Sequence, residues 1–301
     1  MVPLERRNLF MVFFLQQLVN GLSLGSLYGL MAIGYVLIYN TWGVLNFSQG
    51  DMVMIGAFAL LTTHTILGMP IALAIISSII ICALVGFIIE IMAFRPLINA
   101  DNQRRLIATI GIGIFLRNTI QQFYGADAFA FPTIFGNEAI NVGGVYLVPQ
   151  NIWNMVIGIV LVFALMFFLK KTRIGKAMRA TAQDREAARL MGINVTRCMS
   201  LTFVLASVLG GIAGILISPV YQIIATMGET YGNKAFSAAL LGSITSNSGS
   251  MIGGFALGIL ECFAAGYGNS TWQNAVAYFV LFLVLIFKPT GIMGKKEIRK
   301  V

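Results

Sequence analysis

Long apolar stretches separated by short polar segments make up most of this chain of 301 residues. A helix that crosses a membrane needs about 20 mostly apolar residues, and most of the stretches are close to that length. They lack the period-two alternation of barrel strands, so helices are expected. The candidate segments are Leu9–Tyr39, Met52–Leu67, Ile71–Phe94, Leu106–Phe123, Ile152–Leu169, Met199–Val220, Ala235–Ile244, Met251–Tyr267 and Val276–Phe287.

These segments predict an all-α polytopic membrane protein with roughly eight to ten transmembrane or re-entrant helices. Leu9–Tyr39 fits either one long element or two short ones. Ala235–Ile244 is short for a full span, so it needs its flanks or is re-entrant. The apolar run after Arg6 and Arg7 continues without a small-residue cleavage pattern, and it is therefore expected to be a span, not a cleaved signal.

Composition supports a membrane protein. Hydrophobic residues are 58% of the chain and charged residues 10%, whereas soluble domains have about 25% charged residues. These values, with a mean hydropathy of +0.85, exclude a soluble globular enzyme, a disordered chain and a disulfide scaffold. The three cysteines show no metal-binding spacing, and their odd number argues against a complete set of disulfides.

The net charge of +9 reflects blocks of Lys and Arg between the apolar runs. Such blocks are typical of cytoplasmic loops. They lie at 95–105, at 170–197 and after Lys288, whereas Asn118–Leu169 contains no Lys or Arg. We therefore expect the basic blocks and the C-terminus to be cytoplasmic and Gly125–Gln150 to be external. Arg6 and Arg7 favour a cytoplasmic start, which requires an even number of crossings before Arg95.

Glycines recur at spacings that place small residues on one helix face. Gly21, Gly25 and Gly29 repeat every four residues, and Gly254 and Gly258 follow the same spacing. This spacing lets helix backbones approach closely inside a membrane. Tight helix packing is the expected role.

Polar residues inside membrane segments are costly and mark candidate functional positions. Asn46, Ser48, Gln49 and Asp51 interrupt the apolar N-terminal region beside glycines. They form either an irregular element that faces a cavity or partner, or a plain loop between spans. They are candidates for a translocation pathway.

A second polar group contains Arg117 and Asn118, which are further pathway candidates. Arg117 needs water or an acid, and the sequence favours a side chain that extends to the outer surface near Gly125. Glu90 lies five residues before Arg95, so an ion pair between them at the cytoplasmic edge is expected. Glu261 is buried by pattern, and its partner is not evident.

The basic loop contains a segment, Arg179–Gly192, rich in residues that favour helix, and Gly192 is a natural C-terminal cap. Two interpretations stay open. The helix either lies on the anionic membrane surface through its arginines or docks into another protein.

Several strings resemble one family. Glu186-Ala187-Ala188 with Gly192 resembles the Glu-Ala-Ala loop of bacterial ABC importer permeases. The strings Gly43–Ala57, Lys234–Ile244 and Gly249–Glu261, with Leu18–Gly29, resemble hallmarks of the branched-chain amino acid permeases. The likeness covers nearly the whole chain. Ser246–Gly249 stands where that family often has a Gly-Ser or Pro-Gly turn, and we expect the turn to be kept.

The resemblance implies a subunit that moves leucine, isoleucine or valine across the bacterial inner membrane without covalent chemistry, metal or cofactor. It implies one transmembrane permease domain over 1–301 with a cytoplasmic coupling loop at 170–198. The implied partners are a second homologous permease, two ATP-binding subunits, a periplasmic substrate-binding protein and membrane lipid, but no nucleic acid. The residues implied to couple to the ATPase are Ala180, Asp184, Glu186, Ala187, Ala188 and Gly192.

Two alternatives stay open. A permease of the same family could carry urea, short amides or another amino acid. A protein of another class, an ion-driven secondary transporter, would need no coupling helix and would use an intramembrane acid such as Glu261 or Asp51. No Gly-x-x-x-x-Gly-Lys-Ser/Thr sequence is present, so ATP binding by that motif is not expected in this chain.

Overall fold

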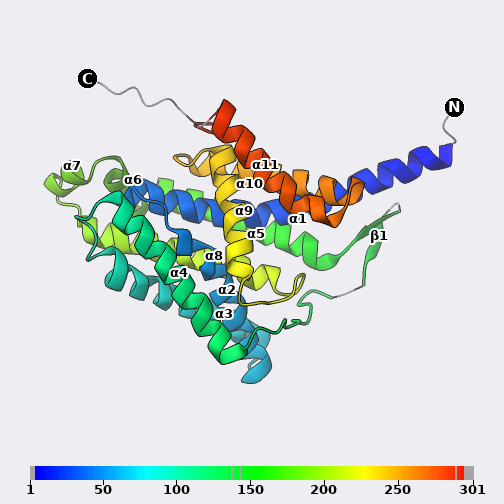
Figure 1. The fold of residues 1–301 in the computed structure, drawn as a ribbon, viewed down its shortest axis with the longest axis horizontal. Coiled ribbons are helices and arrows are strands. Elements are labelled where there is room, and N and C mark those ends of the chain that lie inside the picture. The colour runs from blue at the N-terminus through cyan, green and yellow to red at the C-terminus, as the bar shows by residue number, and fades with distance from the viewer. Residues whose placement is uncertain (1–3, 137, 143, 289, 295–301) are drawn as a thin grey trace.

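The computed structural model describes residues 4–136, 138–142, 144–288 and 290–294, which are mostly helical (Figure 1). The expected all-α polytopic fold is confirmed, with one short hairpin added. The α-helices are α1 (Leu4–Trp42), α2 (Asp51–Leu60), α3 (Ile71–Ile89), α4 (Asn102–Tyr124), α5 (Pro149–Lys171), α6 (Arg173–Gln183), α7 (Arg185–Leu190), α8 (Val195–Ile217), α9 (Met227–Gly242), α10 (Asn247–Tyr267) and α11 (Ser270–Phe287). Short 3₁₀ and π turns, η1 (Phe47–Gln49), η2 (Leu61–Ile66) and η3 (Glu90–Phe94), adjoin them, and β1 (Ile140–Val142) pairs with β2 (Val145–Leu147).

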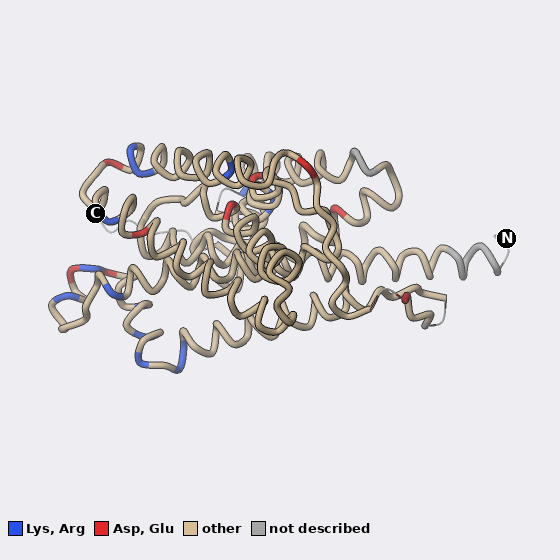
Figure 2. The backbone as a smooth tube through the Cα atoms, turned by 90° about the horizontal axis from the view of Figure 1, so that it is seen from below, with Lys and Arg blue, Asp and Glu red and all other residues tan. Residues whose placement is uncertain are grey.

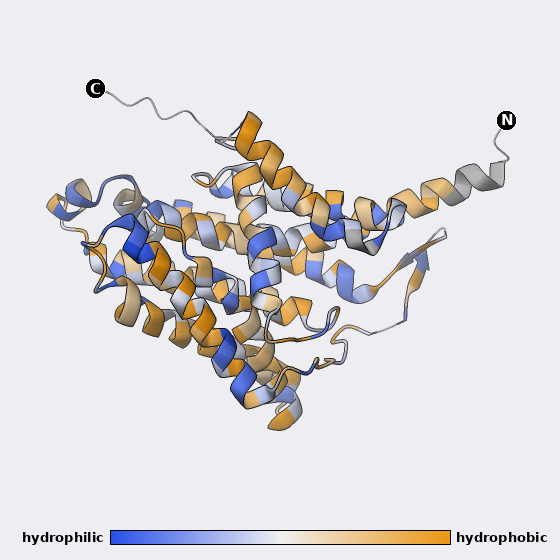
Figure 3. Ribbon diagram, viewed as in Figure 1, coloured by the Kyte–Doolittle hydropathy of each residue, from blue (hydrophilic) through white to orange (hydrophobic). Residues whose placement is uncertain are grey.

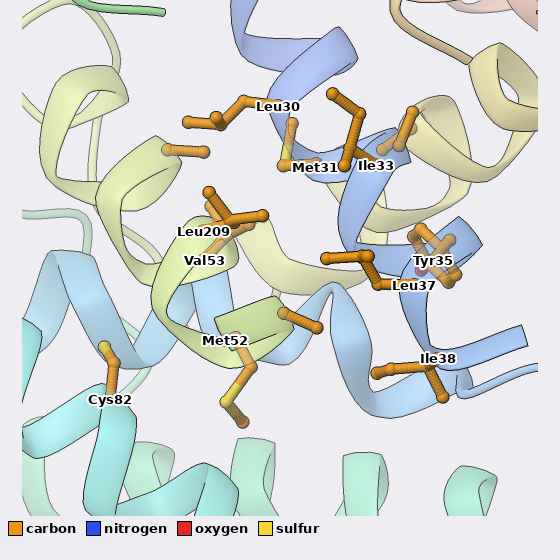
Figure 4. Packing of buried hydrophobic residues seen from close by; sticks show 14 of the residues in the cluster. Leu30, Met31, Ile33, Tyr35, Leu37, Ile38, Met52, Val53, Cys82 and Leu209 are labelled. Atoms are coloured by element: carbon orange, nitrogen blue, oxygen red, sulfur yellow. The ribbon is translucent and has the colours of Figure 1, made fainter. Parts of the chain in front are cut away.

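The core forms where α1, α2, α3 and α8 meet. Apolar side chains from α1, such as Leu30 and Ile33, converge with Met52, Cys82 and Leu209 from the other three helices (Figure 4). All are nearly or fully buried. This core fixes the start of α2, which carries one of the charged residues described below.

Close backbone packing joins α1 to α10. A Cβ atom added to Gly25 would lie 2.7 Å from the Cα of Phe255, and one added to Gly21 would lie 2.7 Å from the Cα of Ile259. Neither position can hold a side chain without separating the helices. The predicted glycine face is confirmed as a packing surface.

Five described helices are long and apolar enough to cross a membrane: those containing Phe10–Trp42, Ile71–Phe94, Pro149–Lys171, Val195–Ile217 and Asn247–Tyr267. The outer faces of α3 and α5 are little covered by the rest of the chain, since 22% and 28% of their apolar windows are buried. Figure 3 shows apolar residues along the outer surfaces of α3, α4 and α11. Such faces are suited to lipid or to another membrane subunit.

The two ends of the molecule differ in charge and structure. Most Lys and Arg residues gather at the end that holds α6 and α7 (Figure 2), and the β1–β2 hairpin lies at the opposite end (Figure 1). The N-terminal part of α1 lies beside the hairpin, where Tyr146 N donates to Gln16 Oε1 at 2.9 Å. α1 therefore starts at the hairpin end and finishes at Trp42 near α7.

This course contradicts one expectation from the sequence. α1, the α2–η2 unit and the α3–η3 unit traverse the molecule before Arg95, an odd number. The inference from Arg6 and Arg7 that α1 begins at the basic end was wrong. The packing of α1 against α10 and the hairpin fixes its direction, whatever charges precede it. The basic positions at 295–301 lie outside the described residues.

Candidate functional site

Three charged residues from three helices meet, and of these Asp51 is buried, Arg117 is partly buried and Glu229 is exposed. Asp51 begins α2, Arg117 is on α4, and Glu229 is in the first turn of α9. Arg117 Nε lies 3.3 Å from Asp51 Oδ1, and Arg117 Nη1 pairs with Glu229 Oε2. Arg117 therefore finds two acids, and the expectation that it extends to the outer surface was wrong. A charge in an apolar setting is stabilised more by nearby acids than by a distant interface.

The three residues line a cavity of about 150 Å³ between α2, α4 and α9. Apolar groups share the wall with them: Phe47 and Ile110 face the same space, as does Tyr35 from α1. The cavity thus combines fixed charges of both signs with an apolar surface. This combination suits a small ligand that carries charge at one end and hydrocarbon at the other.

Glycines allow α9 to approach α2 at this point. A Cβ atom added to Gly228 would lie 2.8 Å from the Cα of Asp51, and one added to Gly232 would lie 2.7 Å from the Cα of Gly50. Gly113 on α4 faces the carboxylate itself, because a Cβ atom added there would lie 2.5 Å from Asp51 Oδ2. The three helices therefore hold the carboxylate of Asp51 between backbones.

The other pathway candidates make hydrogen bonds elsewhere in the structure. Asn46 caps η1, since its Oδ1 accepts from Ser48 N at 3.1 Å and from Ser48 Oγ at 2.7 Å. Gln49 Nε2 donates to the carbonyl of Ala206 at 2.7 Å. Asn118 is exposed and donates to the carbonyl of Ile114 at 2.8 Å. None of these four residues is among those that line the cavity.

Two ion pairs hold other parts of the fold together. Glu90 and Arg95 pair at 3.0 Å, as the sequence predicted, and Arg95 also donates to Ser200 Oγ at 3.0 Å. Lys234 on α9 pairs with Glu261 on α10 at 3.0 Å, and both are buried. Tyr28 adds a hydrogen bond to Glu261 at 2.9 Å. The partner of Glu261 is thus a lysine from the neighbouring helix.

The basic loop contains two short helices where the sequence predicted one. α6 ends at Gln183 and α7 begins at Arg185, with Asp184 between them in an extended conformation (φ −154°, ψ 113°). Asp184 Oδ1 accepts from Glu186 N at 2.9 Å and from Ala187 N at 3.0 Å. An aspartate that caps a new helix outweighs the helix propensity of its neighbours, so the single-helix prediction was wrong.

The α6–α7 segment, residues 173–192, presents its tip to solvent. Leu190 and Met191 are 88% and 81% exposed, and Ala187 is exposed beside them. Ala188 is buried, and Ala180 is half-buried. Gly192 has φ +79°, the left-handed conformation expected of a helix-ending glycine. Figure 1 shows α7 at the edge of the molecule, away from the helix bundle.

Two arginines attach this end to α1. Arg185 Nη2 donates to the carbonyl of Thr41, and Arg105 Nη1 donates to the carbonyl of Trp42 at 2.9 Å. The last carbonyls of a helix lack partners within it and carry partial negative charge, so cations stabilise them. Partial burial, together with the nearby charge of Arg105, lowers the pKa of Arg185 below its ordinary value.

Comparison with known proteins identifies the family. The profile of the family described as "Branched-chain amino acid transport system / permease component" matches residues 17–287. The chain belongs to this permease family. It is 38% identical to the high-affinity branched-chain amino acid transport system permease protein BraD of Pseudomonas aeruginosa, over 96% of this chain and 98% of BraD. It is 37% identical to the corresponding LivH of Salmonella typhimurium, with the same coverage.

Among solved structures, PsaBC from Streptococcus pneumoniae in complex with Fab is similar, with 14% identity, a TM-score of 0.49 and 92% coverage of both chains. The family profile and the two permease relatives confirm the resemblance inferred from the sequence strings at the level of the family. The permease is a multi-pass membrane protein.

Sequence reasoning missed two charged residues of this permease, although a signal was present. Glu229 is the only acid from Met199 to Leu260, and Lys234 is the only Lys or Arg from Met199 to Phe287. Like Arg117, an isolated charge in so long an uncharged stretch indicates a position that needs a partner of opposite charge. Glu229 completes the charged cavity, and Lys234 completes the buried pair with Glu261.

Proposed function

We propose that this permease is the membrane subunit of an ATP-driven importer that moves leucine, isoleucine and valine across the bacterial inner membrane. The family match over residues 17–287 is the observation that carries the proposal. Nearly full-length identity of 37–38% to BraD and LivH supports the same substrate class. The chain would contribute the path through the membrane, and ATP hydrolysis would belong to other subunits.

The proposed assembly contains a second homologous permease, two ATP-binding subunits and a periplasmic substrate-binding protein. The little-covered apolar faces of α3 and α5 supply surface for another membrane subunit or for lipid. We place the α6–α7 segment and the C-terminus in the cytoplasm, because Lys and Arg concentrate there. The β1–β2 hairpin would then face the periplasm and the binding protein.

The α6–α7 segment is the proposed contact with the ATPase. Its exposed tip carries two large apolar side chains, Leu190 and Met191, beside the small residue Ala187. Exposed apolar side chains of this kind favour a protein partner. Asp184 and Gly192 would define the shape of the tip by starting and ending α7, and Glu186 would lie on its exposed side.

Transport would follow alternating access. Closure of the ATPase subunits would displace α7, and the hydrogen bond from Arg185 to Thr41 would pass that displacement to α1. α1 packs closely on α10 through its glycine face, so the two helices would move together. The path beside α2, α4 and α9 would then open to one side of the membrane at a time.

Reconstitution into proteoliposomes tests the proposal. The permease would be co-purified with its partner permease and ATPase subunits, and uptake would be measured with the binding protein outside and ATP inside. We expect ATP-dependent uptake of leucine, isoleucine and valine, and none when the ATPase cannot hydrolyse ATP. Uptake driven by an ion gradient alone would contradict the proposal. Uptake confined to urea or short amides would contradict the substrate class.

A further inference from the structure

The carboxylate of Asp51 has an oxygen without a hydrogen-bond donor. Arg117 Nε lies 3.3 Å from Asp51 Oδ1, but its hydrogen points to the carbonyl of Gly113, to which it donates at 3.2 Å. Oδ1 is buried and accepts no hydrogen bond from any described residue. The side chain is only 3% exposed, and although Asp51 is ion-paired with Arg117, a buried charged oxygen that accepts no hydrogen bond is costly. A donor from outside the chain would remove that cost.

The charges around the cavity favour a cationic donor. Among the described residues that line it, Asp51 and Glu229 are acids and Arg117 is the single base. One guanidinium facing two carboxylates leaves the cavity with a negative balance. An ammonium group entering beside Asp51 Oδ1 would offset the carboxylate charge at that point and donate the missing hydrogen bond.

We propose that this cavity holds the α-ammonium group of the transported amino acid, with Asp51 Oδ1 as its acceptor. The inference rests on the proposed function and extends it to a binding site. Among the described residues, Arg117 Nη2 makes no hydrogen bond, so it can receive the carboxylate of the same molecule. The apolar side chain would lie against Phe47 and Ile110, which line the same space.

Cysteine protection tests the site directly. Ile110→Cys places a thiol on the cavity wall, where Ile110 is 40% exposed. Cys82 and Cys198 are buried, and Cys262→Ala removes the half-buried cysteine. The rate of modification by neutral N-ethylmaleimide would be measured on the assembled transporter with leucine, with 4-methylpentanoate, which lacks the ammonium, or with 3-methylbutylamine, which lacks the carboxylate.

We expect leucine and 3-methylbutylamine to slow modification and 4-methylpentanoate to have little effect. In Asp51→Asn, the leucine concentration for half-protection should rise about tenfold or more, because the ammonium group loses a charged acceptor and keeps only a neutral one. Thr119→Ala is the matched control on α4, since Thr119 donates to the carbonyl of Phe115 at 2.8 Å and lies outside the cavity, and it should leave protection unchanged.

Equal protection by leucine and 4-methylpentanoate would overturn the inference, as would unchanged protection in Asp51→Asn. The comparison of ligands needs no change at Asp51, so it stands even if that variant fails to assemble. It also separates this inference from the proposed function, because protection is measured without turnover. Normal ATP-driven uptake of leucine together with no protection at Ile110→Cys would refute the site and leave the proposed function intact.

Discussion

Arg185 and Thr41 connect the exposed end of the molecule to its longest helix, because the guanidinium of Arg185 donates to the backbone carbonyl of Thr41 in the last turn of α1. Arg185 is the first residue of α7, so any movement of that helix reaches α1 through this contact. Arg105 holds the adjacent carbonyl of Trp42 at 2.9 Å and anchors the same helix end from α4.

Arg185→Ala should therefore uncouple transport from ATP hydrolysis. Loss of a charged hydrogen bond to a helix end predicts a fall in uptake of roughly tenfold. Binding of the ATPase should persist, since Arg185 points towards α1 and away from the exposed tip. Arg189→Ala is the control, because Arg189 is exposed on the same helix. An equal loss of uptake in both variants would mean that charge in α7, not the contact with Thr41, is what matters.

Charge added at Ala187 distinguishes the two interpretations of the α6–α7 segment. If α7 enters a packed cleft of an ATPase, both Ala187→Glu and Ala187→Lys should abolish uptake and reduce co-purification of the ATPase, because the cleft has little room for added volume. If α7 lies on anionic lipid, Ala187→Lys should retain both uptake and co-purification of the ATPase. Ala139→Lys adds the same charge to an exposed position at the hairpin end and should leave co-purification of the ATPase unchanged.

The spans could be predicted from the sequence because a membrane requires about 20 apolar residues whatever the fold. The Glu90–Arg95 pair could be predicted because its members are close in sequence, five residues apart. The pairing of Arg117 with Asp51 could not, because it depends on which helices pack together over a long separation in sequence. The break at Asp184 was missed because propensity favoured a continuous helix while the capping aspartate stops it. The direction of α1 was missed because the prediction used only the charges of Arg6 and Arg7. The packing of α1 against α10 and the hairpin, which sets its direction, is not visible in the sequence.

The buried pair of Lys234 and Glu261 should stabilise the folded assembly. Lys234→Met or Glu261→Gln would leave one charge unpaired in the interior, which costs about 3–5 kcal/mol. Each single variant should lower the thermal unfolding temperature of the purified assembly. The double variant should be more stable than the sum of the two losses predicts, because it leaves no isolated charge. Strictly additive losses would show that packing, not pairing, sets the effect.

The direction of α1 gives the last prediction, which concerns the two faces of the membrane. Glu138 near the hairpin and Lys176 in α6 are exposed at opposite ends of the molecule. In the Cys262→Ala background, Glu138→Cys should react with a membrane-impermeant maleimide in spheroplasts, and Lys176→Cys should react only in inverted vesicles. The reason is that residues 170–197 are rich in Lys and Arg whereas Asn118–Leu169 has none. An epitope at the N-terminus should be accessible from the same side as Glu138, because α1 starts beside the hairpin. Labelling of both cysteines from one side would refute the topology, and an epitope on the side of Lys176 would refute the course of α1.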